Sequence, residues 1–158
     1  MELKTVIIIG FGAVLSLLVG CQPSVNQETE KARIKAVLDS YITSIESEDI
    51  NLYGKILEPD PNMVNFGTSE PPIVGWESLR KVIEDQNAAL SQTKIAASDL
   101  NICLSERGDF AWATDLWDFR AMMDGQPLQI PVRCTWVLEK LHGQWVIVHF
   151  HKSVRAAS

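Results

Sequence analysis

Residues 132–154 read V-R-C-T-W-V-L-E-K-L-H-G-Q-W-V-I-V-H-F-H-K-S-V, and this stretch decides the fold. Two runs rich in β-branched and aromatic residues flank residues 141–144, so the stretch predicts an antiparallel hairpin. Neither face of the second strand is plainly polar, and we expect both faces to be covered. In that strand, alternation with a period of two separates two sets of side chains. They are Trp145, Ile147, His149, His151 and Ser153 on one face, and Val146, Val148, Phe150 and Lys152 on the other.

The rest of the second half of the chain also has the pattern of strands. Residues 95–106 alternate between apolar and polar positions, and residues 110–123 and 128–140 form two further long runs. Turns are expected at Arg107-Gly108-Asp109 and at residues 124–127. Four consecutive antiparallel strands are therefore predicted.

The first half of the chain has helical periodicity instead. Apolar residues recur at intervals of three and four between residues 29 and 47, which predicts an amphipathic helix. Shorter helices are expected at residues 50–57 and 79–90, with a short strand at residues 63–66 between them. Helices first and long strands afterwards indicate an α+β domain in which a curved sheet wraps around the helices.

The N-terminus has the pattern of an export signal. Residues 5–20 are uncharged and apolar, follow Lys4, and are too short to span a bilayer comfortably. Leu-Val-Gly-Cys, ending at Cys21, resembles the lipobox of bacterial lipoproteins, which implies cleavage before Cys21 and lipidation of its thiol. We expect a lipoprotein signal peptide at residues 1–20, a lipidated tether at 21–28 and a folded domain at 29–158. An ordinary signal peptide or signal anchor with an incidental cysteine is the alternative.

Lipidation would set the location of the protein. Two acyl chains on Cys21 would hold the domain stably on a membrane without a spanning helix. Gln22, rather than aspartate, follows this cysteine. By resemblance to lipoprotein sorting, that residue implies the periplasmic side of the outer membrane if the source has two membranes.

Charge and cysteine use argue against several classes of function. The net charge is −6, and no basic stripe with interleaved aromatic residues is present, so nucleic acid is not an expected partner. There is no Cys-x-x-Cys pair and no His-Glu-x-x-His spacing, and we predict neither a metal site nor a cofactor. Cys103 and Cys134 fall in predicted strands, where buried cysteines are more often small hydrophobic residues than disulfide partners.

Several stretches resemble one known superfamily. W-V-I-V-H-F-H-K-S at residues 145–153 resembles the closing strand of the SnoaL-like and calmodulin-dependent kinase II association-domain branches of the nuclear transport factor 2-like superfamily. Residues 65–68 and 74–77 resemble its loop and helix entry, and residues 133–138 with 143–145 resemble its penultimate strand and turn. The resemblance implies a SnoaL-like domain in which a cone-shaped antiparallel sheet surrounds N-terminal helices. It leaves the activity open, because the superfamily includes isomerases, dehydratases and assembly domains.

The resemblance also implies a pocket inside the cone, which we expect to bind a small apolar or aromatic ligand. Five tryptophans in the chain suit large, flat apolar surfaces. Two opposite alternations fit residues 110–123: one groups Trp112 with Asp118, and the other groups Asp115 with Trp117. The sequence does not choose between these faces. The aromatic residues expected at the pocket are Tyr41, Tyr53, Phe66, Trp76, Trp112 and Trp117.

Polar residues in these segments suggest proton transfer without a cofactor. A proton next to a carbonyl group can be removed by a histidine or a desolvated carboxylate, while a tyrosine holds the developing enolate. We expect His149 or His151 as the base, Tyr41 or Tyr53 as the donor, and Asp118 as a further catalytic candidate.

Two strand residues could bind a carboxylate. Arg133 beside Thr135 offers a planar fork of donors for such a group. An ion pair with Glu139 or Asp118 on the outer face is the alternative for this arginine.

Two functions of different kinds remain open. The first is a ligand-binding domain or an isomerase-like or lyase-like enzyme. The second is a non-catalytic module for binding or oligomerisation. The kinase association-domain resemblance implies a homodimer through the outer face of the sheet, with Val146, Val148 and Phe150 at the contact.

Overall fold

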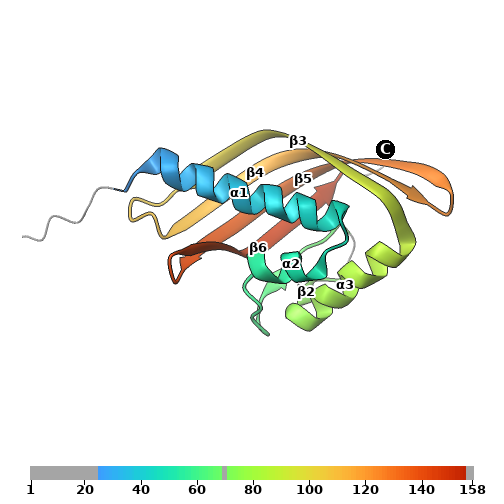
Figure 1. Cartoon of the computed structure of the whole chain (residues 1–158), viewed down its shortest axis with the longest axis horizontal. Coiled ribbons are helices and arrows are strands. Elements are labelled where there is room, and N and C mark those ends of the chain that lie inside the picture. The colour runs from blue at the N-terminus through green and yellow to red at the C-terminus, as the bar shows by residue number, and fades with distance from the viewer. Residues whose placement is uncertain (1–24, 69–70, 156–158) are drawn as a thin grey trace, which may run out of the picture.

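The computed structural model describes residues 25–68 and 71–155, and it has the predicted α+β order (Figure 1). Helices and a two-stranded ribbon come first: α1 (Gln27–Glu46), α2 (Ile50–Ile56), β1 (Val64–Asn65), β2 (Ile73–Val74) and α3 (Trp76–Ala89). Four long strands follow: β3 (Leu90–Leu104), β4 (Phe110–Met123), β5 (Gln126–Leu141) and β6 (Gln144–Val154). The predicted fold class is therefore confirmed.

The predicted signal peptide and Cys21 lie outside the described residues. Within the described ranges, no helix has both the length and the apolar character that crossing a bilayer requires.

The four long strands form one antiparallel sheet in the order β3-β4-β5-β6. Asp124-Gly125 joins β4 to β5 and His142-Gly143 joins β5 to β6, and all four turn residues have φ between 51° and 82°. Two consecutive residues with positive φ are typical of type I′ turns, whose twist matches that of the paired strands. These turns set the register of the last three strands.

Two β-bulges bend β3. They interrupt its pairing with β4 between Ser91 and Lys94 and between Ser98 and Asn101. A bulge adds an unpaired residue, which bends the strand and increases its twist. Figure 1 shows the resulting arch of β3 and its neighbours over α1.

The last residue of α1 ties the helix to the first of these bulges. Glu46 Oε1 accepts a hydrogen bond from the backbone N of Ile95 at 2.7 Å, and Glu46 Oε2 lies 3.2 Å from Lys94 Nζ. The backbone N of Ile95 is available for this contact because β3 is an edge strand of the sheet, and the contact holds the end of the helix against the sheet.

A third bulge, in β6, breaks the predicted alternation. Leu138 pairs with Ile147 and Val137 pairs with His149, so Val148 is an extra residue on β6. Before this bulge the odd-numbered side chains face the helices, and after it the even-numbered side chains do. The prediction of one continuous alternation is therefore wrong, because one extra residue turns every later side chain to the opposite face.

The helices cover the inner face of the sheet. The buried side chains of α1 include Ile34, Leu38, Tyr41 and Ile45, which recur at helical spacing and meet the fully buried Trp136 region of β5. Burial of each large apolar side chain contributes about 1.5–3 kcal/mol to folding. This stripe is the apolar face that the helical periodicity of residues 29–47 predicted, and the inner face of the sheet covers it.

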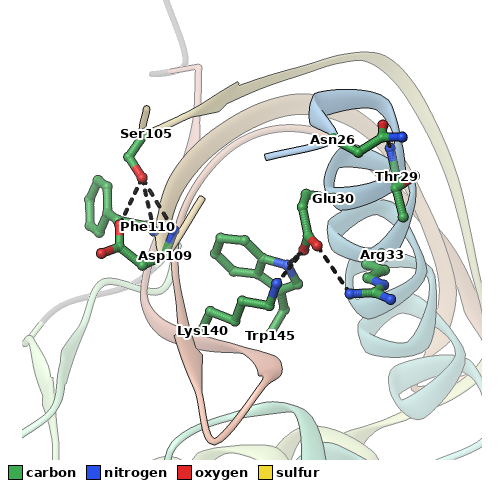
Figure 2. Close-up of polar contacts among 9 residues, drawn as sticks. All are labelled: Asn26, Thr29, Glu30, Arg33, Ser105, Asp109, Phe110, Lys140 and Trp145. Carbon is green, nitrogen blue, oxygen red and sulfur yellow. Dashed lines mark hydrogen bonds and ion pairs between the residues drawn. The ribbon is translucent and has the colours of Figure 1, made fainter. Parts of the chain in front are cut away.

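A buried carboxylate joins α1 to the β5–β6 hairpin (Figure 2). Glu30 Oε2 accepts a hydrogen bond from Trp145 Nε1 at 2.7 Å and lies 2.8 Å from Lys140 Nζ. Arg33 lies 3.0 Å from the other oxygen, Oε1. Hydrogen bonds from Lys140 and then from Trp145 lower the pKa of Glu30. The network fixes one end of the helix above the sheet.

The Arg107-Gly108-Asp109 turn joins β3 to β4, as predicted, and Ser105 organises it. Ser105 Oγ accepts hydrogen bonds from the backbone N of Asp109 at 3.3 Å and of Phe110 at 3.2 Å (Figure 2). Gly108 has a φ of 68°, and a Cβ there would lie 2.6 Å from Val25 Cγ1. The turn is thus packed against the residue that leads into α1.

Candidate functional site

A cavity of about 300 Å³ lies between the inner face of the sheet and the three helices. Its walls are mainly apolar, and among the described residues that line it, 25–68 and 71–155, only Lys152 carries a charge. The lining includes Tyr41 and Ile45 of α1, Tyr53 of α2, Ile83 of α3, Trp117 of β4, Ile130 of β5 and Phe150 of β6. A cavity of this size lies at the lower end of the range of about 300–1,000 Å³ for small-molecule sites.

Lys152 of β6 provides the cationic group of the cavity. Its Nζ donates a hydrogen bond to Tyr41 Oη at 2.8 Å. Four aromatic rings surround the amine, with centroids at 4.5 Å for Tyr41, 4.7 Å for Trp117, 4.9 Å for Phe150 and 5.7 Å for Trp136. The ammonium ion is therefore held by ring faces and a phenol.

The environment of Lys152 favours the neutral amine. Lys152 forms no ion pair with any residue in the described part of the chain. Burial lowers the pKa of Lys152 to about 8, although Cys134 and Asp115 act in the opposite direction. At pH 7 roughly a tenth of this amine is then unprotonated, a much larger share than for a lysine with the ordinary pKa of 10.5.

Two tyrosines form a pair beside this amine. The hydroxyl groups of Tyr41 and Tyr53 are hydrogen-bonded to each other, and both side chains are buried. Burial raises the pKa of both phenols, so each stays protonated at neutral pH. Lys152, Tyr41 and Tyr53 form a continuous chain of exchangeable protons at the cavity wall.

Asp115 supports the aromatic wall from within the core. Its Oδ2 accepts a hydrogen bond from Trp117 Nε1 at 2.7 Å, and its Oδ1 accepts one from Trp136 Nε1 at 2.8 Å. It lies opposite Cys134, which lies opposite Lys152, so the three residues form a row across β4, β5 and β6. This row places a buried carboxylate two strands away from the buried amine.

The two cysteines occupy opposite faces of the sheet. Cys134 belongs to the buried core, whereas Cys103 pairs with the exposed Trp112 on β4. Both thiols are free. Burial raises the pKa of the Cys134 thiol, which keeps it protonated at neutral pH. Within residues 25–68 and 71–155, no three His, Cys, Asp or Glu side chains are arranged to hold a metal ion.

Three of the predicted site residues meet at the cavity. Tyr41, Tyr53 and Trp117 all line it. Of the two alternations on β4, the one that includes Asp115 and Trp117 faces the core. This choice follows from packing, because the small side chains Ala111 and Ala113 of the same alternation are also fully buried.

The predicted catalytic residues His149, His151 and Asp118 lie away from the cavity. The two histidines follow the bulge in β6 and therefore lie on the face opposite Lys152. His149 Nδ1 contacts the backbone oxygen of Val64 at 2.6 Å. Asp118 accepts hydrogen bonds from Arg120 at 2.6 Å and from Gln129 at 2.7 Å. Our placement of these three residues in the pocket was therefore incorrect.

The remaining predicted ligand contacts are also outside the cavity lining. Trp112, Arg133 and Thr135 are exposed on the outer face, defined as the face of the sheet turned away from the helices. Phe66 is exposed and packs edge-on against His149 and His151. Trp76 is half-buried at the start of α3, where its ring lies next to Gly54 of α2.

The sequence analysis did not identify Lys152 as a site residue. The available signal was its alternation with Phe150 and Val154, which put a lysine in an otherwise apolar row. Period-two reasoning separated this row from the histidines, but a strand pattern does not reveal which row faces the helices.

A family model described as a SnoaL-like domain matches residues 34–157, a range that includes every described residue lining the cavity. The chain belongs to this family. The SnoaL-like match agrees with the fold and with the resemblance on which the sequence analysis relied.

Solved structures of the nuclear transport factor 2-like fold superpose on this SnoaL-like domain. A superfamily protein from Salmonella enterica is 23% identical, with a TM-score of 0.75, over 83% of this chain and 94% of that chain. A ketosteroid isomerase-like protein from Erwinia carotovora is 18% identical, with a TM-score of 0.68, over 84% and 100%. A Xanthomonas campestris protein named for a calcium/calmodulin-dependent protein kinase II association domain is 19% identical, with a TM-score of 0.69, over 79% and 87%. At these identities the likeness establishes the fold alone, and no curated protein matches the chain.

Proposed function

We propose that this SnoaL-like domain binds a small apolar or aromatic ligand in the cavity and transfers a proton on it without a cofactor. The observation that carries the proposal is the Lys152–Tyr41 pair, 2.8 Å apart, in a mainly apolar lining. A ligand with a flat apolar body and one polar group would bury its body against the rings and direct the polar group to this pair.

The amine and the phenols have complementary roles in this chemistry. A neutral Lys152 can accept a proton, because its pKa of about 8 lies near the working pH. The protonated phenol of Tyr41 can donate a hydrogen bond to an oxygen on which negative charge develops. The likeness to a ketosteroid isomerase-like protein supports an isomerase-like or lyase-like reaction of this kind.

Filling the cavity is expected to abolish ligand binding. In Ile130→Trp the larger side chain would occupy much of the lining on β5, so the dissociation constant for 2-naphthol should rise more than about tenfold. Gln129→Trp is the matched control, because it places the same side chain on the exposed neighbouring residue. Isothermal titration calorimetry on both variants, with circular dichroism to verify folding, measures the effect. Equal affinity in the two variants would place the binding site elsewhere.

We also propose that lipidation of Cys21 tethers the domain to the bacterial cell envelope. The support is the lipobox-like sequence before Cys21 and the polar segment that follows it. Wild-type protein should remain with the membrane fraction after a high-salt wash, and Cys21→Ser should release most of it. Unchanged membrane association of the serine variant would reject lipid anchoring at this residue.

The outer face supports a further proposal, a homodimer. Phe110, Trp112 and Leu116 lie on the same face of β4, with exposed fractions of 40%, 43% and 44%. Apolar side chains grouped on an open sheet face are typical of contact surfaces. Phe150, which the sequence analysis placed at this contact, lies in the core instead with an exposed fraction of 2%.

Light scattering tests the dimer directly. The wild-type chain should have the mass of a dimer, and Trp112→Arg should convert it to a monomer, because the new charge would be desolvated at the contact. A wild-type chain that stays monomeric at high concentration would contradict the proposal.

A further inference from the structure

Near its C-terminal end, β6 carries Lys152 at the wall of the mainly apolar cavity. Lys152 lines the cavity, and its Nζ is enclosed by the rings of Tyr41, Trp117 and Phe150 at 4.5–4.9 Å. Cation–π contacts of this kind hold the side chain in one place. The amine is therefore held in place at the wall of the cavity.

The surroundings of this amine suit nucleophilic chemistry. No carboxylate in the described part of the chain forms an ion pair with Lys152, and burial lowers its pKa to about 8. A desolvated lysine amine without an anionic partner is the form that adds to carbonyl groups. The position of the amine and its lowered pKa both favour addition to a carbonyl group.

We infer that Lys152 captures an aldehyde or a ketone in this cavity as an imine. The inference rests on the proposed function, since it requires that the cavity accept an organic ligand, and it narrows the ligand to carbonyl compounds. The lining favours a neutral carbonyl compound over a carboxylate, because the described residues that line it offer one amine and no second cation.

The reaction balances without an oxidant or a reductant. The lone pair of the neutral Nζ attacks the carbonyl carbon, a C–N bond forms, and the π electrons of the C=O bond move to the oxygen. The nitrogen loses one proton, the oxygen gains one, and a carbinolamine results. The oxygen then receives a second proton and leaves as water while the nitrogen lone pair forms the C=N bond. Loss of the remaining proton from nitrogen balances that gain and gives the neutral imine.

The tyrosine pair can carry these protons. Tyr41 Oη lies 2.8 Å from Nζ, and its hydroxyl is hydrogen-bonded to that of Tyr53. Tyr41 can take the proton released by nitrogen as it gives its own to oxygen, so that no charge accumulates on the phenol. A protonated imine also withdraws electrons from the neighbouring C–H bond, which favours isomerase-like or lyase-like proton transfer.

Reductive trapping tests the inference. The purified full chain is treated with 2-naphthaldehyde and sodium cyanoborohydride, and the products are analysed by intact mass and peptide mapping. We expect one adduct, on Lys152, with a mass equal to that of the aldehyde less its oxygen atom. At neutral pH the labelling rate should exceed that of exposed lysines by more than about tenfold, since each pKa unit changes the neutral fraction tenfold. The rate should level off above pH 8, whereas labelling of exposed lysines should continue to rise.

Two variants and one analogue separate the possible outcomes. Lys152→Arg keeps the positive charge without the reactive amine and should lose the adduct, whereas Lys35→Arg, at an exposed lysine of α1, should retain it. The analogue 2-naphthylmethanol has the same rings without the carbonyl group and should bind the wild-type chain.

Binding of the alcohol with no adduct on Lys152, or labelling that follows exposure across all lysines, would overturn imine capture and leave the proposed function standing. Tight binding of 2-naphthoate with no adduct would indicate a carboxylate site, which also overturns it. If neither the aldehyde nor the alcohol binds, both the proposed function and the inference fail.

Discussion

Asp115→Asn is expected to lower the free energy of unfolding by roughly 2–4 kcal/mol, because the carboxylate accepts hydrogen bonds from two buried indoles. An asparagine of the same shape retains one acceptor, but its amide N–H₂ must face the N–H of Trp117 or Trp136. Two donors then meet in the core, and one of them is left without an acceptor.

The same substitution removes a negative charge near the cavity. Asp115 raises the pKa of Lys152, so its loss should lower that pKa below about 8. Urea unfolding followed by circular dichroism measures the stability change, and the pH profile of reductive labelling at Lys152 measures the pKa change.

Asp118→Asn is the matched control on the same strand. Asp118 accepts hydrogen bonds on the outer face from Arg120 and Gln129, where solvent can replace the lost contacts. Its substitution should change stability much less than that of Asp115. Equal effects at the two positions would show that Asp115 does not support the tryptophans as we describe.

Lys152→Met is expected to raise the free energy of unfolding at pH 7 by roughly 1–3 kcal/mol. A fall in pKa from 10.5 to about 8 means that the folded protein disfavours the charged amine relative to the unfolded chain. Loss of the cation–π contacts and of the hydrogen bond to Tyr41 offsets part of the gain. Methionine has a similar volume and packs well against aromatic rings, so the wall of the cavity should remain intact.

The gain should depend on pH in a defined direction. Below pH 8 the amine is charged in both the folded and the unfolded wild-type protein, and the advantage of the methionine variant is complete. Between pH 8 and 10.5 the unfolded wild-type chain binds more protons than the folded protein, so wild-type stability rises with pH and the advantage shrinks. Above pH 10.5 the advantage should be nearly lost.

Chemical denaturation of both proteins at pH 7 and pH 10 checks this prediction. Lys35→Met, at an exposed lysine, controls for the general effect of losing one positive charge and should show no such dependence on pH. A destabilised Lys152→Met at pH 7, or a difference that does not shrink at high pH, would contradict the assignment of Lys152 as a destabilised buried cation.

The sequence was sufficient for the order and type of the elements, because these depend on local patterns. Type I′ turns at Asp124-Gly125 and His142-Gly143 join β-branched runs, and the helical stripe of α1 continues through Tyr41. β3 begins at Leu90, earlier than predicted, because the chain leaves α3 directly in an extended conformation there. The small β2 strand was not predicted, since it consists of only Ile73 and Val74.

The site was only partly predictable. Tyr41, Tyr53 and Trp117 were expected at the pocket from their type and from the elements that carry them. Which face of β6 meets α1 decides that Lys152 lines the cavity and that His149 and His151 do not. That choice involves contacts between segments more than a hundred residues apart.

By itself, the sequence of this SnoaL-like domain determined the elements, their order and the turns between them, because short-range periodicity and turn chemistry specify these. The tertiary structure alone decided which face of β6 lines the cavity. One additional residue at Val148 reverses the alternation of β6, because successive side chains of a strand point to opposite faces. That single bulge places an amine, and no histidine, beside the tyrosine pair.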